Sequence, residues 1–147
     1  MFNRVLMVCV GNICRSPTAE AVLRDRLDGT GIAVESAGLA ALSGKPIHPL
    51  AEAVLGEHGG SGASHVARQI DRRLIDEAGL ILVMERKHLQ AIDRIAPHAR
   101  GKTFLLGKWQ GDVEIPDPYR RERHAYEHAF RLIDESIARW RPHLSPR

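Results

Sequence analysis

The two cysteines of the chain lie close together beside an arginine. Cys9 and Cys14 are the only thiols among 147 residues, and Arg15 and Ser16 come next in the stretch VCVGNICRSP. A cysteine thiolate is a strong nucleophile, and a guanidinium can hold two phosphate oxygens with its planar fork of N–H groups. This segment is therefore the first candidate for covalent catalysis on an anionic substrate.

The spacing within this segment suits an anion-binding loop. Five residues separate Cys9 from Arg15, which gives the pattern Cys-x5-Arg. A turn of this length between a strand and a helix directs several backbone N–H groups into one concavity, and the helix dipole adds to the attraction. Gly11 leaves room for the backbone to approach a ligand. Besides Arg15, we expect six residues of this turn to contact the substrate: Val10, Gly11, Asn12, Ile13, Cys14 and Ser16.

The same charges act on the sulfur of Cys9. A helix N-terminus and a neighbouring cation both favour a thiolate, and the hydroxyl of Ser16 can donate a hydrogen bond to it. We therefore interpret Cys9 as the nucleophile and Arg15 as the group that holds the anion. The alternative is structural: two small buried thiols near a sheet edge, with Arg15 on the surface.

Short apolar runs and helical patterns alternate along the chain and must position this loop. Val5–Val10 is a continuous apolar run that indicates a buried strand, after which Ser16 can cap a helix and Pro17 suits its first turn. Further strands are expected at Ile32–Ala37, Leu80–Met84 and Thr103–Leu106. Further helices are expected from Pro49 to Gly59 and at Asp71–Glu77, Lys87–Ile95 and Arg123–Trp140, with a long loop at 107–121.

This alternation predicts an α/β protein with a four-stranded parallel sheet and helices on both faces. We expect the flavodoxin-like strand order 2-1-3-4, which places the loop after the first strand at the carboxyl edge where such sheets bind ligands. The sequence has no repeat or linker, so we expect residues 1–147 to form a single domain.

Composition narrows the class of protein. A hydrophobic fraction of 44% and a charged fraction of 27% are ordinary for a soluble globular protein. No apolar run approaches the ~20 residues that span a bilayer, so no stable membrane insertion is expected. Two cysteines cannot form a disulfide framework, and reduced thiols are typical of a cytoplasmic protein. An aromatic content of 5% argues against nucleic acid as a partner, whereas the net charge of +3 favours anionic partners.

Four motifs resemble those of one known family. The stretch CVGNICRSPTAEAVL is similar to the signature of the low-molecular-weight protein tyrosine phosphatases. The other motifs are DPY at 117–119, ESAGL at 35–39 and HVARQI at 65–70. The resemblance spans nearly the whole chain and is strongest to bacterial members paired with tyrosine autokinases of capsule and exopolysaccharide export. It implies a single phosphatase domain over residues 1–147.

This resemblance implies a reaction and its residues. Cys9 would attack phosphotyrosine to form a phosphocysteine, with Arg15 holding the phosphate and Asp117 protonating the leaving oxygen. The chemistry needs no metal or cofactor. The pair His124 and His128 has helical spacing but lacks an evident third ligand. The partner implied is a phosphotyrosine protein, namely a tyrosine autokinase of the membrane.

The resemblance also implies roles for residues outside the catalytic set. Ser36 and His65 would form hydrogen bonds that support the loop at Asn12, a residue type that tolerates a left-handed backbone. Leu39 and Tyr119 would wall the entrance against a flat phenyl ring.

Two residues of the loop bear on specificity and redox chemistry. A threonine stands at the place of Ile13 in arginine-phosphate relatives, so Ile13 favours tyrosine. Cys14 is either a small structural filler or the partner of Cys9 in a reversible protective disulfide.

Two other functions remain open from the sequence. An arsenate reductase of this fold passes oxidation to further cysteines downstream, but none follows Cys14. A phosphotyrosine-binding module without turnover would keep the anion loop and would need neither Cys9 nor Asp117. The basic cluster of Arg120, Arg121 and Arg123 is either a solvated surface or a site that attracts an acidic phosphopeptide.

Overall fold

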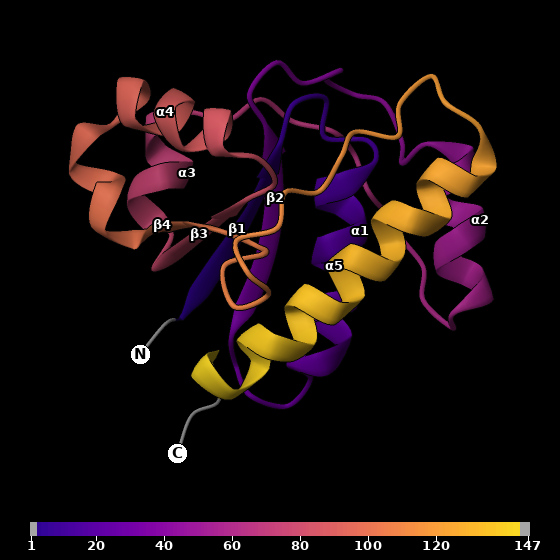
Figure 1. The fold of residues 1–147 in the computed structure, drawn as a ribbon. Helices are drawn as coiled ribbons and strands as arrows, with labels where there is room; N and C mark the ends of the chain where they lie inside the picture. Colours follow the sequence, from indigo (N-terminus) through magenta and orange to yellow (C-terminus); the bar gives the residue numbers. More distant parts are fainter. Residues whose placement is uncertain (1–2, 145–147) are drawn as a thin grey trace.

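Four short strands form one parallel sheet through the middle of the molecule (Figure 1). The structure is a computed structural model and describes residues 3–144. The sheet order is β2-β1-β3-β4, which confirms the predicted α/β class and strand order. The strands are β1 (Arg4–Cys9), β2 (Ala33–Gly38), β3 (Leu80–Val83) and β4 (Thr103–Leu105).

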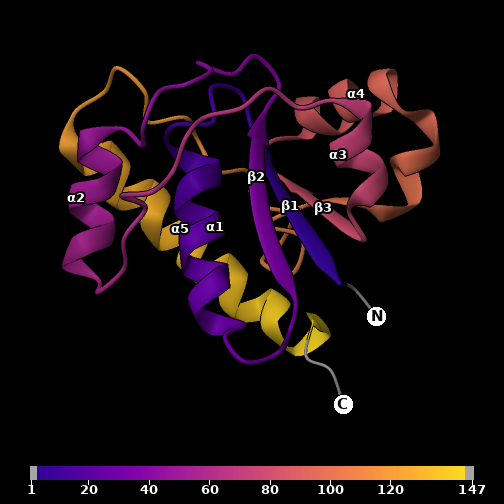
Figure 2. The ribbon, with the colours of Figure 1, turned by 180° about the vertical axis from the view of Figure 1, so that it is seen from behind.

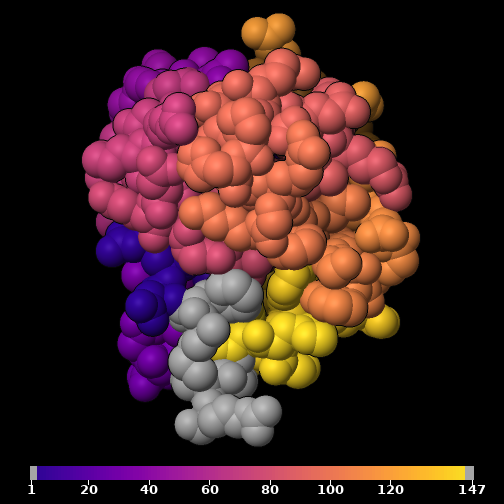
Figure 3. All heavy atoms as spheres, turned by 90° about the vertical axis from the view of Figure 1, so that its left-hand side faces the viewer, coloured from indigo at the N-terminus to yellow at the C-terminus, as the bar shows by residue number. Residues whose placement is uncertain are grey.

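Helices cover both faces of this sheet (Figures 1 and 2). On one face lie α1 (Arg15–Arg26) and α5 (Arg123–Leu144), with α2 (Pro49–Glu57) packed against both of them. On the other face lie α3 (Arg72–Glu77), α4 (Arg86–Ile95) and the short 3-10 helix η1 (Pro97–Lys102). Seen from that side, the residues of α3, α4 and η1 form a continuous cover over the sheet (Figure 3).

Strand β1 shows why its sequence is an uninterrupted apolar run. Val5 and Met7 point into the core cluster with α1 and α5, whereas Leu6 and Val8 point into the cluster with α3 and α4. All four side chains are fully buried. A strand with helices on both faces needs apolar side chains at every position, because successive side chains alternate between the faces.

Three details differ from the expected elements. Helix α5 continues past Trp140 to Leu144, because the Trp140 indole donates a hydrogen bond to Leu106 O over 2.8 Å and Leu144 is buried. Helix η1 was not expected. Ser16 is not the cap of α1: it lies in the first turn, and Cys14 occupies the cap position without a capping side-chain hydrogen bond.

The carboxyl ends of β1 and β2 hold two loops against each other. The segment after β2 donates three backbone hydrogen bonds to carbonyls at and after the end of β1: from Leu39 to Cys9, from Ala40 to Val10, and from Leu42 to Gly11. This pairing extends the sheet beyond its strands and fixes the path of both loops. Among residues 3–144, no helix is long and apolar enough to cross a membrane.

Gly38 stands where the two loops are closest. A Cβ atom at this position would lie 2.5 Å from Val10 O and 3.0 Å from Asn12 Cβ. Gly38→Ala is therefore expected to lower the free energy of unfolding by about 1–3 kcal/mol, because neither backbone can yield without breaking the pairing.

Urea denaturation of Gly38→Ala beside Gly56→Ala checks this expectation. Gly56 lies within α2, and a Cβ there meets nothing within 4 Å, so the control is expected to gain about 0.5–1 kcal/mol. Equal effects in both variants would contradict the close approach at Gly38.

Candidate active site

The loop from β1 to α1 closes around the sulfur of Cys9. Cys9 is the last residue of β1, and Ser16 is the second residue of α1. The Ser16 hydroxyl lies 2.9 Å from Cys9 Sγ, and the Ser16 backbone N–H donates to the same sulfur over 3.4 Å. Donors that point at a sulfur at the start of a helix favour its thiolate form.

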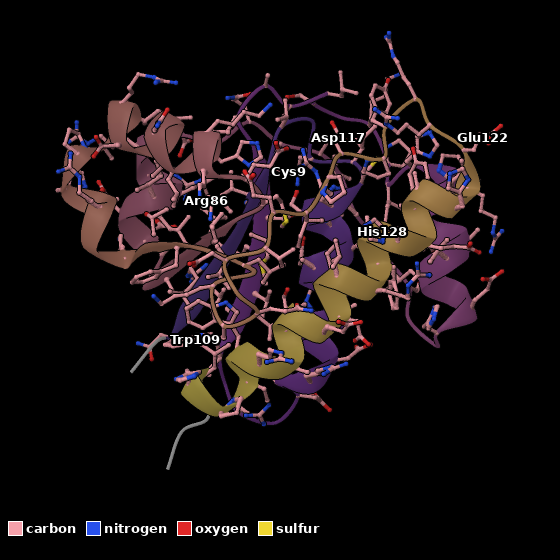
Figure 4. All side chains as sticks on the ribbon, viewed as in Figure 1. Cys9, Arg86, Trp109, Asp117, Glu122 and His128 are labelled. Carbon is pink, nitrogen blue, oxygen red and sulfur yellow. The ribbon has the colours of Figure 1, made fainter. Side chains whose placement is uncertain are left out.

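A hollow of about 150 Å³ opens over this loop. Asp117 and Tyr119 reach its rim from the long loop before α5. Figure 4 shows Cys9 and Asp117 near each other at the carboxyl edge of the sheet, whereas Trp109 lies toward the other end. The lining consists of residues 9–15, Ala40, Leu42, Asp117 and Tyr119.

Asn12 links the loop to its surroundings. Its φ of 60° lies in the left-handed region, which asparagine tolerates better than most residues. The Asn12 amide donates to Ser16 Oγ over 2.7 Å and to Ser36 Oγ over 3.0 Å, and its Oδ1 accepts from Arg68 N over 2.9 Å. His65 Nε2 lies 2.6 Å from the Asn12 carbonyl, which can only accept. Ser36 and His65 thus contact the loop as expected.

Arg15 is almost fully buried and is held from two sides. Its Nη1 donates to Glu85 Oε2 over 2.6 Å and to Ile115 O over 2.8 Å, while Nη2 lies 3.6 Å from Asp117 Oδ2. Burial opposes the charge of Glu85, but the hydrogen bond and charge of Arg15 outweigh it and lower the pKa of Glu85. The guanidinium therefore has a defined orientation toward the hollow.

Asp117 is accessible from solvent and lies between Pro116 and Pro118. Its Oδ1 accepts a hydrogen bond from Tyr119 N over 3.1 Å, which fixes the carboxyl group within the turn. The two prolines restrict the backbone on both sides. A carboxyl group held across the hollow from Cys9 can exchange a proton with a bound ligand.

One residue that we expect in the wall of the hollow lies elsewhere. Leu39 does not line it, because its side chain packs against the core cluster of α3 and α4. Leu42, which is 39% exposed, stands in that place, three residues further along the loop. Ile13 and Tyr119 line the hollow where the sequence placed them.

The second cysteine has a different environment. Cys14 Sγ donates to Tyr126 Oη over 3.8 Å, and burial raises the pKa of Cys14 to about 12. The ring of Tyr126 stacks on His48 with centroids 5.1 Å apart. Both cysteines are free. The disulfide between Cys9 and Cys14 stays a prediction.

Sequence reasoning missed three contacts of this site. Glu85, Arg68 and Tyr126 contact Arg15, Asn12 and Cys14 in turn. Arg68 lies in the HVARQI motif but has no role assigned from the sequence, and Glu85 and Tyr126 belong to no motif. A signal existed for Glu85: it is a charged residue two positions after Val83, at the carboxyl edge of a central strand.

Comparisons with known proteins match this geometry. A family model described as "low molecular weight phosphotyrosine protein phosphatase" covers residues 4–146. The chain belongs to this family. It is 49% identical over 140 residues to the low molecular weight protein-tyrosine-phosphatase Wzb of Salmonella typhimurium, and the match covers 95% of this chain and 93% of that protein.

Solved structures of relatives superpose closely on this phosphatase. One is Vibrio vulnificus Wzb in complex with benzylphosphonate, with a TM-score of 0.94, 46% identity, and coverage of 98% of this chain and 100% of that one. Another is the YwlE arginine phosphatase from Geobacillus stearothermophilus, with a TM-score of 0.90, 36% identity, and coverage of 96% and 92%. The chain is thus a protein tyrosine phosphatase by family, and the fold is shared with an arginine phosphatase.

A buried histidine makes the stability of the phosphatase depend on pH. His88 accepts a hydrogen bond from Glu85 N over 3.2 Å, and burial, helped by the charge of Arg15, lowers its pKa to about 4. The unfolded chain binds this proton near pH 6.5, whereas the folded protein resists it. Stability is therefore complete above about pH 6.5 and is lost as the pH falls toward 4.

Replacing His88 tests this dependence. His88→Asn keeps an acceptor for Glu85 N and removes the titrating group. As the pH falls from 6.5 to 4, the free energy of unfolding of the variant is expected to decrease less steeply than that of the parent. The difference between the two slopes is up to about 1.4 kcal/mol per pH unit. Urea denaturation at several pH values measures the two slopes, and identical slopes would show that His88 does not carry this dependence.

Proposed function

We propose that the hollow above Cys9 hydrolyses phosphotyrosine in proteins through a phosphocysteine intermediate. The observation that carries this proposal is the set of groups around one point: the sulfur with its two donors from Ser16, the fixed guanidinium of Arg15 and the carboxyl group of Asp117. The family membership supports the same reaction.

The first step transfers the phosphoryl group to sulfur. Cys9 Sγ attacks the phosphorus in line, a P–S bond forms, and the bond from phosphorus to the tyrosine oxygen breaks. Asp117 gives its proton to that oxygen, so tyrosine leaves as a neutral phenol. Arg15 and the backbone N–H groups of the loop hold the three equatorial oxygens as charge develops on them.

The second step returns the enzyme to its starting state. The carboxylate of Asp117 takes a proton from a water molecule as the water oxygen attacks phosphorus. The P–S bond breaks, inorganic phosphate leaves, and Cys9 regains its thiolate form. Ser16 stabilises this leaving sulfur through the same hydrogen bonds that prepare it for attack.

Substitutions of Cys9 and Asp117 test these roles separately. Cys9→Ser is expected to abolish turnover of p-nitrophenyl phosphate. Asp117→Asn is expected to lower kcat/KM for phosphotyrosine by about 10²–10⁴-fold, because the phenolate then leaves without a proton. The loss should be smaller for p-nitrophenyl phosphate, whose leaving group needs a proton less. Steady-state assays with EDTA present measure both effects.

These assays also separate the competing functions. A Cys9→Ser protein that still turned over the aryl phosphate would exclude the phosphocysteine. A parent protein that bound phosphotyrosine without hydrolysing it would be a binding module. Arsenate-dependent oxidation of the thiols would favour an arsenate reductase, although the chain has no cysteine after Cys14 to receive it.

Ile13 is proposed to select phosphotyrosine over phosphoarginine. It is buried and lines the hollow with apolar carbon, which suits a phenyl ring better than a guanidinium. Ile13→Thr is expected to raise the ratio of kcat/KM for phosphoarginine to that for phosphotyrosine by about tenfold. Competition assays with the two phospho amino acids in peptides measure this ratio, and an unchanged ratio would remove Ile13 from specificity.

The physiological substrate that we propose is a bacterial membrane tyrosine autokinase of exopolysaccharide production. Support comes from the likeness to Wzb and from the resemblance of the signature motif. We further propose that residues 1–147 act as one phosphatase domain in the cytoplasm. Trapping with Asp117→Ala protein in a lysate, followed by identification of the bound phosphosites, tests the substrate. A trap that holds only proteins other than such a kinase would contradict it.

A further inference from the structure

A second hollow adjoins the first on the other side of Asp117. Its volume is about 530 Å³, and Val10, Arg15 and Asp117 line both hollows. We call it the basic groove, because Lys87, Arg121, His124 and His128 line it. Figure 4 shows His128 on the upper half of α5, below Asp117 in that view. A ligand bound at Cys9 thus has this groove directly beside it.

Two basic side chains of the groove lack an acidic partner in the part of the chain that the structure describes. Arg121 and His128 have no ion pair among residues 3–144, and Lys87 Nζ lies 3.7 Å from Glu85 Oε1. Glu85 already gives its other oxygen to Arg15 over 2.6 Å. Only Asp117 adds another carboxyl group to the lining. An anion that entered the groove would therefore meet Arg121 without a competing carboxylate partner from the described residues.

The other arginines near the basic groove already have partners. Arg123 pairs with Glu57 and with Glu127, and Arg120 lies over the Tyr119 ring at 5.5 Å. The arginine cluster that stands out in the sequence thus divides, and Arg121 alone enters the basic groove.

Neither a carboxylate of the neighbouring turn nor a metal ion suits the basic groove. Glu122 lies 3.8 Å from His124 but is almost fully exposed, so it does not fill the groove. Among residues 3–144, no group of three or more His, Cys, Asp and Glu side chains is arranged to hold a metal ion. His124 and His128 can each donate or accept a hydrogen bond.

We propose that the basic groove binds an aspartate or glutamate that flanks the phosphotyrosine of a substrate protein. The proposal rests on the proposed function and names its substrate class. Lys87 and Arg121 supply the charge for the flanking carboxylate, and His124 and His128 lie beside it. An extended chain advances about 3.3 Å per residue, so a side chain within a few positions of the phosphotyrosine reaches the neighbouring hollow.

The expected size of the preference for the acidic peptide depends on how exposed the charges of the basic groove are. Lys87 is 71% exposed, and pairs between exposed charges each contribute about 0.2–1 kcal/mol. Two such contacts give about a twofold to thirtyfold preference in kcat/KM. The preference is expected to shrink as NaCl is raised from about 50 mM to about 0.5 M, because salt screens exposed charges.

A matched pair of phosphopeptides tests the proposal. Both carry one phosphotyrosine, and two flanking positions on each side are Glu in one peptide and Gln in the other. The full-length parent is compared with Lys87→Gln/Arg121→Gln and with the control Arg94→Gln/Arg139→Gln. The control removes the same charge from exposed positions of α4 and α5 that do not line the groove.

The expected result is specific to one peptide. The groove variant should lose the preference for the Glu peptide, while its rates on the Gln peptide and on p-nitrophenyl phosphate match the parent. The control should keep the preference. Equal rates of the parent on both peptides, or a preference that survives in the groove variant, would overturn the proposal and leave the phosphatase function intact. A parent inactive on both peptides would overturn the proposed function as well.

Discussion

The hydrogen bonds of one buried asparagine hold the loop between β1 and α1 in place. Asn12 adopts a left-handed backbone and connects the loop to α1, to β2 and to the segment around His65. A loop whose backbone N–H groups face a ligand site cannot use them for hydrogen bonds within the loop. Contacts from other segments must therefore fix its shape. Ser16 Oγ accepts a hydrogen bond from the Asn12 amide and lies 2.9 Å from Cys9 Sγ, so one hydroxyl couples the sulfur to the rest of the fold.

The arrangement of charges in the site depends on a second buried side chain, that of Arg15. Arg15 is buried, and a buried guanidinium is tolerated only when acceptors surround it. Glu85, just after β3, and the carbonyl of Ile115 in the long loop supply them, while Asp117 stays at a longer distance. The arginine is thus oriented by one carboxylate and left near a second. This arrangement leaves the carboxyl group of Asp117 available for the proton exchange that we propose.

Local features of the sequence predicted most of the fold and the centre of the site. Cys9 and Arg15 are near each other along the chain, and apolar runs such as that of β1 reveal strands buried on both faces. Contacts between distant segments were harder to predict. Glu85 meets Arg15 because β3 pairs with β1, and Leu42 replaces Leu39 because the loop after β2 first pairs its backbone with the neighbouring loop. Ser16 was mistaken for a cap because a hydroxyl at a helix start can serve either a backbone or a sulfur.

The walls of the hollow come from separate loops on one rigid sheet edge. The chain after β1 forms its floor, the chain after β2 contributes Leu42, and the loop before α5 contributes Asp117 and Tyr119. Each wall can therefore change its side chains without disturbing the strands that carry the nucleophile. A shared scaffold of this kind lets substrate preference diverge while the chemistry stays constant, as the likeness to an arginine phosphatase with 36% identity illustrates.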